Sequence, residues 1–181
     1  MKAINITGKH NIDKINEIGN ESYQAVRKHM LKFDETLYDH LKQLALVREI
    51  YTEKNVDAVV TNAEDIKIKS LLKSELNHKI QGYKGQDLKK EIHDGETLIN
   101  LQDVFIKLID SNMTCYYCSK PIVVLYKNVR EPLQWTLDRL DNALSHTKEN
   151  TCIACLKCNL QRRVMNVEKF TFTKKLKINK L

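Results

Sequence analysis

The sequence predicts an α+β fold, in which a mainly helical N-terminal region, residues 1–96, precedes a small C-terminal unit, residues 97–181, made of two strands and a helix. Apolar residues recur close to the 3.6-residue helical period through much of the first 110 residues. All five cysteines lie between residues 115 and 158, with a β-branched apolar run between them. With 42% hydrophobic and 29% charged residues, the 181-residue chain fits one or two small globular domains and excludes a disordered or fibrous protein.

Helical segments are expected at several places in the first 110 residues. A less regular apolar segment covers residues 12–30, and Asp34 can cap a helix that continues to Ile50. Another helix is expected to start near residues 62–63 and to continue to Leu76. Three glycines are expected to break the Lys-rich stretch after it into a loop: Gly82, Gly85 and Gly95. Asn100 precedes a last helix that ends just before the first cysteines.

The C-terminal unit has a different pattern. Residues 122–126 form a β-branched apolar run, and residues 135–140 alternate as a second strand would. Residues 141–150 are polar and are expected to form a loop. Apolar residues after Cys155 suit a short helix. The expected order is therefore cysteine pair, strand, strand, loop, cysteine pair, helix.

Two Cys-x-x-Cys pairs, Cys115 with Cys118 and Cys155 with Cys158, frame this unit. Each pair can present two thiolates to one ion, and two pairs complete the tetrahedral four-sulfur site that Zn²⁺ prefers. A redox role for one pair is the alternative, although redox motifs need a single pair. The odd cysteine count and the lack of an export signal argue against a disulfide framework. We therefore expect a structural zinc ion.

The positive charge is concentrated in the C-terminal part. The chain carries a net charge of +7, and residues 111–181 hold thirteen Lys/Arg against five Asp/Glu. Such a field favours a polyanion such as nucleic acid, or an acidic membrane face, as partner; a solvated basic surface without function is the alternative. No apolar run approaches the roughly 18 residues of a membrane span. The protein is therefore expected in an intracellular, reducing compartment, not in a membrane.

The order of these features resembles the HNH endonucleases, whose ββα-metal finger is held together by zinc in one branch. That branch includes phage recombination endonuclease VII and HNH proteins of large DNA viruses. The resemblance covers roughly residues 97–177 and is carried by three segments: Trp135–Asn142, His146–Asn150 and Cys155–Arg162. It implies a DNA endonuclease of the cytoplasm or nucleus, including that of a virus-infected host cell.

The resemblance also implies roles for single residues. Asp138 and Asn159 match the positions that bind the catalytic metal, and oxygen ligands suit Mg²⁺ or Mn²⁺. The four-sulfur zinc would be structural and would hold the strands to the helix. Asn150 would orient the loop through backbone hydrogen bonds. Three basic residues are expected to contact DNA, with plain solvated charge as the alternative: Lys157, Arg162 and Arg163.

Arg139 departs from the family pattern, because most HNH nucleases have their general-base histidine at this position. Arginine stays protonated and cannot accept a proton from water, although it could hold a phosphate oxygen. Asp141 and His146 are the candidate bases. Asp141, which is nearer in sequence to Asp138, is slightly preferred; activation of water by the metal alone is a further option.

The function expected from the sequence is therefore that of a divalent-metal-dependent endonuclease that hydrolyses phosphodiester bonds in DNA, with RNA not excluded. One alternative is a zinc-stabilised DNA-binding module that does not cut. Another is a structural assembly protein that uses the N-terminal helices. These helices, whose histidines lack metal-ligand spacing, are expected to position DNA or to form a homodimer or larger assembly.

Overall fold

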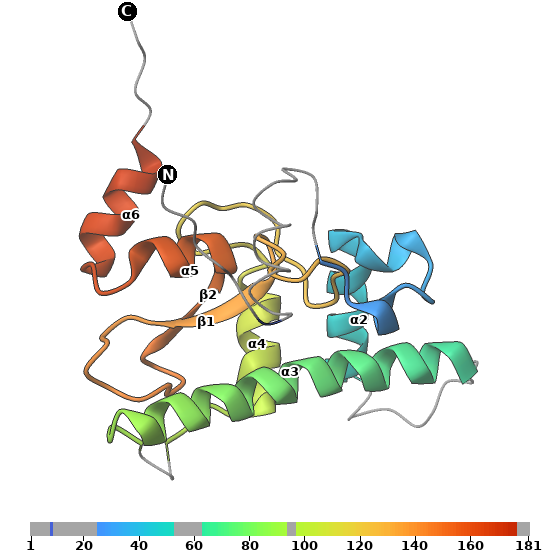
Figure 1. Cartoon of the computed structure of the whole chain (residues 1–181), viewed down its shortest axis with the longest axis horizontal. Helices are drawn as coiled ribbons and strands as arrows, with labels where there is room; N and C mark the ends of the chain where they lie inside the picture. Colours follow the sequence, from blue (N-terminus) through green and yellow to red (C-terminus); the bar gives the residue numbers. More distant parts are fainter. Residues whose placement is uncertain (1–7, 9–24, 53–62, 94–96, 177–181) are drawn as a thin grey trace, which may run out of the picture.

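A computed structural model describes Gly8 and residues 25–52, 63–93 and 97–176. Its elements confirm the α+β class. Most of the apolar segment expected over residues 12–30 lies outside the described residues. Along the chain the elements are the 3₁₀ helices η1 (Lys28–Met30) and η2 (Glu35–Tyr38), then α2 (His40–Thr52), α3 (Ala63–Lys89), α4 (Leu101–Asp110), β1 (Trp135–Arg139), β2 (Thr151–Cys155), α5 (Leu156–Arg162) and α6 (Val167–Lys175). In Figure 1, α3 runs along one side of the molecule, with α2 toward one end and the sheet toward the other.

The first cap lies where the sequence predicts it, but on a shorter element. The Asp34 side chain accepts a hydrogen bond from the Thr36 amide and caps η2. Asp39 then has extended backbone angles, so the chain leaves the helical path before α2 begins. The expected helix from Asp34 to Ile50 is therefore two elements.

Helix α3 starts at Ala63 as predicted but continues 27 residues to Lys89, so the predicted break at Gly82 and Gly85 is wrong. The buried residues of the helix continue at helical spacing past both glycines: Lys69, Leu72, Leu76, Ile80, Tyr83 and Asp87. A helical glycine costs about 1 kcal/mol relative to alanine. Burying a large apolar side chain contributes about 1.5–3 kcal/mol, so the buried face outweighs the glycines.

Helix α4 confirms the predicted start after Asn100. The Asn100 side chain accepts a hydrogen bond from the Asp103 amide at 3.0 Å, and the Asp103 carboxylate accepts one from the Asn100 amide in return. This capping box satisfies amides that a helix start leaves without partners. The buried face of α4 consists of Val104, Phe105 and Leu108.

The expected strand over residues 122–126 does not form, because the side chain of Gln43 takes the place of a strand partner. The Gln43 Oε1 atom, fully buried on α2, accepts from the Val124 amide at 2.7 Å and the Leu125 amide at 2.9 Å. Its Nε2 atom donates to the Leu125 carbonyl at 2.8 Å. These contacts satisfy an extended backbone without a β-ladder.

The second strand of the sheet is instead β2, in residues between the loop and the second cysteine pair, where the sequence predicts no strand. Strand β2 pairs with β1 in antiparallel register, with Asp138 opposite Cys152 and Trp135 opposite Cys155. All five residues of each strand are buried. The order is therefore cysteine pair, extended segment, strand, loop, strand, cysteine pair, helix.

One hydrophobic core contains residues from both regions that the sequence separates at residue 96. It joins Leu76 and Ile80 of α3 to Phe105 of α4 and to Trp135 and Leu137 of β1. The division into two domains stays a prediction. None of the described helices combines the length and apolar character that a membrane crossing requires.

Candidate metal centre and adjoining pocket

The two cysteine pairs come together as the sequence predicts. The Sγ atoms of Cys115, Cys118, Cys155 and Cys158 all lie within 4.8 Å of one another. Zn–S bonds of about 2.3 Å in a tetrahedron require sulfur separations near 3.8 Å. The Cys118 and Cys155 sulfurs are 3.9 Å apart. The cluster therefore fits a zinc ion.

Backbone contacts of the sheet bring these cysteines together. The Tyr116 amide donates to the Ile153 carbonyl at 2.9 Å, which fastens the first cysteine pair beside β2. Strand β2 ends at Cys155, the N-cap of α5, and its Sγ accepts from the Cys158 amide. The second pair therefore lies at the strand-to-helix junction.

The thiols of Cys115, Cys155 and Cys158 have shifted pKa values. A hydrogen bond from the Cys155 thiol lowers the pKa of Cys115 to about 4, and the same contact raises the pKa of Cys155. Burial raises the pKa of Cys158 to about 12. Thiolates packed this closely need a cation to ionise together, which a zinc ion supplies. Cys152 lies outside the cluster, and burial raises its pKa also to about 12.

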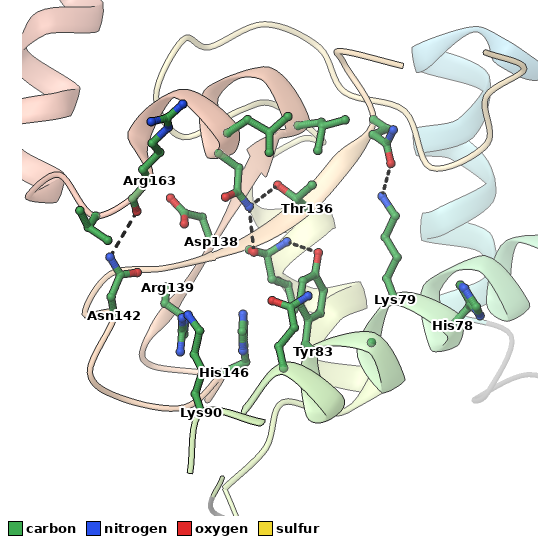
Figure 2. A pocket seen from close by; sticks show the side chains of 18 of the residues that line it. His78, Lys79, Tyr83, Lys90, Thr136, Asp138, Arg139, Asn142, His146 and Arg163 are labelled. Carbon is green, nitrogen blue, oxygen red and sulfur yellow. Dashed lines mark hydrogen bonds between the residues drawn. The ribbon is translucent and has the colours of Figure 1, made fainter. Parts of the chain in front are cut away.

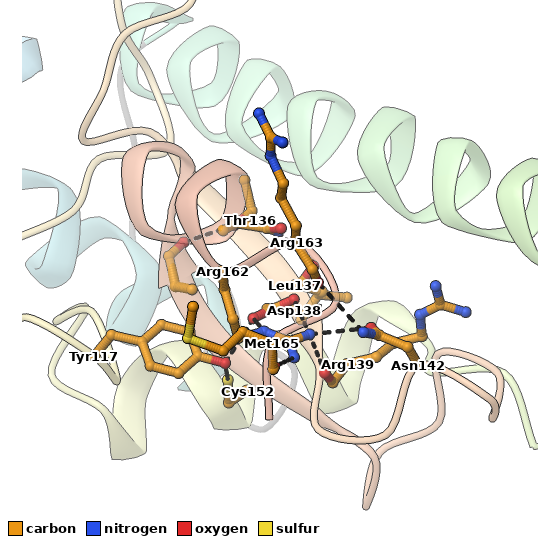
Figure 3. A network of polar contacts seen from close by, with 12 residues as sticks. Tyr117, Thr136, Leu137, Asp138, Arg139, Asn142, Cys152, Arg162, Arg163 and Met165 are labelled. Carbon is orange, nitrogen blue, oxygen red and sulfur yellow. Dashed lines mark hydrogen bonds and ion pairs between the residues drawn. The ribbon is translucent and has the colours of Figure 1, made fainter. Parts of the chain in front are cut away.

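Asp138 lies at the centre of a buried polar network between β1 and α5 (Figure 3). Its Oδ2 atom accepts from Arg162 Nε at 2.5 Å and from the Tyr117 hydroxyl at 2.6 Å. Its Oδ1 atom accepts from Arg162 Nη2 at 2.8 Å. Burial is the main cause that raises the pKa of Tyr117, so its hydroxyl stays protonated and donates.

Arg162 is therefore a structural side chain, and the expected phosphate contact from this residue is wrong. Only 2% of Arg162 is exposed. Besides Asp138, its guanidinium donates to three acceptors, the Met165 carbonyl, the Arg139 carbonyl and Asn142 Oδ1. These contacts tie the end of α5 to β1 and to the loop that follows. The next residue, Arg163, is exposed.

A hard cation at Asp138 and Asn159 would need free lone pairs on their side-chain oxygens. Each carboxylate oxygen offers about two lone pairs, so Oδ2 is filled and Oδ1 keeps one. The Asn159 Nδ2 atom donates to Thr136 Oγ1 at 3.0 Å and to the Leu137 carbonyl at 3.2 Å. Among the described residues nothing donates to Asn159 Oδ1. One carboxylate oxygen and one amide oxygen are thus available at one pocket, as Mg²⁺ or Mn²⁺ binding would need.

That pocket has a volume of about 720 Å³ and lies between α3 and the sheet (Figure 2). Helix α3 contributes Tyr83 and Lys79 to it, and Lys90 follows the end of this helix. The sheet, the loop and α5 contribute the polar residues of the expected site. Three strong cations line it, namely Lys90, Arg139 and Arg163, and Asp138 is the one carboxylate among its described lining residues. Lys79 adds less charge, because burial lowers its pKa to about 7. Since Arg162 already neutralises Asp138, the field in the pocket favours an anion.

His146 enters this pocket from the loop between the strands. Its Nδ1 atom lies 2.7 Å from Oδ1 of Asp87, and its ring stacks on Tyr83 with the centroids 4.7 Å apart. Burial lowers the pKa of His146, as do Arg139 and Lys90, whereas Asp87 opposes the shift. The Nε2 atom has no hydrogen-bond partner among the described residues.

The remaining expected residues fall into two groups. Asp141 is exposed and does not line the pocket, because its Oδ1 caps the Ala143 amide in a turn. Lys157 is exposed outside the pocket. Asn150 makes the backbone hydrogen bonds that its orienting role requires: it accepts from the Asp141 amide and donates to the Asp141 and Ser145 carbonyls.

Tyr83, Asp87 and Tyr117 contact the expected site residues but were absent from the sequence prediction. Of these three, Asp87 could have been noticed in the sequence, because it is a carboxylate at a position that continues the helical spacing of apolar residues on α3. A carboxylate at such a position is more informative than an apolar residue there.

Comparisons of the chain with protein-family models, with curated proteins and with solved structures found no match in any of the three. The functional interpretation therefore depends on the geometry of the site.

Proposed function

We propose that the protein is a divalent-metal-dependent endonuclease that hydrolyses phosphodiester bonds, with a structural zinc ion at the four cysteines. One observation carries the proposal: a single cationic pocket contains His146, Arg139, Arg163, Asp138 and Asn159. A proton acceptor, phosphate-binding cations and oxygen ligands are the groups that this hydrolysis needs. The reaction would leave a 5′-phosphate and a 3′-hydroxyl, as the HNH resemblance implies.

His146 would act as the general base. Its Nδ1 faces a carboxylate, so the ring carries the proton there and leaves the Nε2 lone pair free to accept one from water. Its lowered pKa keeps the ring neutral near pH 7. Asp141 is a poorer candidate, because its carboxylate holds a turn outside the pocket.

Arg139 and Arg163 would hold the substrate phosphates. Arg139 donates to the Leu144 carbonyl through Nη1, which fixes the guanidinium at the pocket wall. Arg163 is exposed at the rim, where its charge adds to the attraction for a polyanion. Asp138 and Asn159 would hold Mg²⁺ or Mn²⁺, which would neutralise phosphate charge and stabilise the leaving oxygen.

Nicking of supercoiled plasmid by the zinc-loaded protein, with Mg²⁺ or Mn²⁺ added, tests the proposal. We expect Asn159→Ala and His146→Asn to abolish nicking at unchanged zinc content and circular dichroism. Asp141→Asn is the matched control and should keep activity within a few-fold. Asp138→Ala is a poor probe, since it would leave Arg162 buried without its ionic partner. Equal nicking by the wild type and by Asn159→Ala and His146→Asn would refute the proposal.

A second candidate is a nucleic-acid-binding module that does not cut. The ion pair between Asp138 and Arg162 favours it, because this carboxylate already has a cationic partner. Such a module would retard DNA or RNA in gels at low salt without nicking it in either metal. An assembly protein would do neither, and light scattering would show its oligomers.

A further inference from the structure

We propose that Asp87 on α3 is the positioning residue of the active site, holding His146 in the tautomer that accepts a proton at Nε2. The inference rests on the proposed function and extends it. It means that the site is incomplete without a helix from the N-terminal region, 59 residues earlier in the chain.

The contact joins both carboxylate oxygens of Asp87 to the ring Nδ1 and the backbone amide of His146. Asp87 Oδ1 lies 2.7 Å from His146 Nδ1, and Asp87 Oδ2 accepts from the His146 backbone amide at 2.8 Å. Asp87 is fully buried, so water does not compete for these bonds. Two simultaneous contacts fix the position of the residue and the rotation of its ring.

The residues around the His146 ring leave only its Nε2 edge accessible from the pocket. Tyr83 covers one face of the imidazole, and the Tyr83 hydroxyl accepts from the Leu137 amide at 2.9 Å, which ties α3 to β1. The carboxylate occupies the Nδ1 edge. Nε2 is left at the pocket, whose other wall carries Asp138 (Figure 2).

The charges around the ring are also defined. Asp87 faces it from α3, Lys90 from the turn that follows α3, and Arg139 from β1, with Arg139 Nη1 3.6 Å from Asp87 Oδ1. The two cations disfavour the imidazolium and the carboxylate favours it. Loss of the carboxylate alone would therefore make the ring a weaker base as well as a misoriented one.

A purely structural role would tie the loop of residues 141–150 to α3 without setting the tautomer. The two roles predict different spectra. A positioning carboxylate requires a proton on Nδ1 and a lone pair on Nε2 in the wild type. A structural tie needs only the backbone contact at Oδ2.

The test is ¹⁵N–¹H correlation spectroscopy of the histidine rings in the zinc-loaded full chain at pH 8, with plasmid nicking in parallel. The six histidines give six ring systems, and His146→Asn assigns the one of interest. We expect the Nδ1–H tautomer in the wild type. In Asp87→Asn we expect a shift toward Nε2–H and a fall in the single-turnover nicking rate of about 10²- to 10⁴-fold, the contribution of a general base. DNA affinity should stay unchanged.

Asp110→Asn is the matched control, because it makes the same chemical change at an exposed residue of α4 that does not line the pocket. It should leave both the tautomer and the rate within a few-fold. Asp87→Glu, which keeps the charge, should restore part of the rate lost in Asp87→Asn. A wild-type Nε2–H tautomer would overturn the inference without any variant, even where Asp87→Asn fails to fold. An Nδ1–H tautomer in a protein that never nicks would refute the endonuclease and keep the Asp87 contact.

Discussion

Arg162 is buried and Arg163, the next residue, is exposed. Replacing each by alanine compares the contribution of a buried, ion-paired arginine to stability with that of an arginine on the surface. Arg162 is 2% exposed and makes five hydrogen bonds, two of them to Asp138. Breaking a buried ion pair by removing one partner costs about 3–5 kcal/mol, because the other charge stays buried. In a chain of this size each kcal/mol lowers Tm by about 2–4 °C. We therefore expect Arg162→Ala to lower Tm by about 6–20 °C.

Arg163→Ala should change the free energy of unfolding by less than about 0.5 kcal/mol, as surface substitutions do. It should weaken DNA binding and reduce the magnitude of the log–log salt slope by about 1. Urea unfolding followed by circular dichroism at saturating zinc measures the first effect, and binding titrations at several salt concentrations measure the second.

A double-mutant cycle identifies the partner of Arg162. Combining Arg162→Met with Asp138→Asn removes both charges, so the double variant should lose less stability than the sum of the single variants. An Arg162→Ala variant within 1 kcal/mol of wild type would refute the reasoning. So would additive losses in the cycle.

Further predictions concern zinc, pH and the core. Chelation of zinc, or Cys158→Ser, should unfold the C-terminal unit, since structural zinc supplies on the order of 10 kcal/mol; near-ultraviolet circular dichroism during chelator titration reports it. Burial lowers the pKa of Lys79 to about 7, so the unfolded chain binds a proton that the folded chain releases, and this residue makes stability rise from about pH 7 to 10.5. Urea midpoints across this range should rise less with pH in Lys79→Met. Gln43→Leu removes the side-chain partner of four buried backbone groups and should cost at least about 3 kcal/mol by urea unfolding; a loss under 1 kcal/mol contradicts this account.

The elements predicted correctly from sequence are those that local chemistry determines. The spacing of Cys115, Cys118, Cys155 and Cys158 suffices to predict their cluster, because each Cys-x-x-Cys turn presents both sulfurs to one side. The Asn100 cap is equally local, since its partner lies three residues away. Such contacts need no knowledge of the rest of the fold.

The elements predicted wrongly depend on partners distant in sequence. The apolar run at residues 122–126 has strand composition, but Gln43 occupies its hydrogen-bonding groups from 81–82 residues away. The glycines of α3 predict a break that Tyr83 and Asp87 prevent by packing against the sheet and its loop. Arg162 is basic, as residues that contact DNA often are, but its ion pair with Asp138 places its side chain in the interior.

The Gln43 side chain also affects the order in which parts of the chain can fold during synthesis. Its acceptors and donors lie up to 82 residues downstream, and ribosomes add about 5–20 residues per second. For about 4–16 s the nascent chain therefore carries an amide that can bind only the Leu37 carbonyl, because its partners at Val124 and Leu125 do not yet exist. Helix α2 can form in that interval, but its docking waits for translation to pass Leu125.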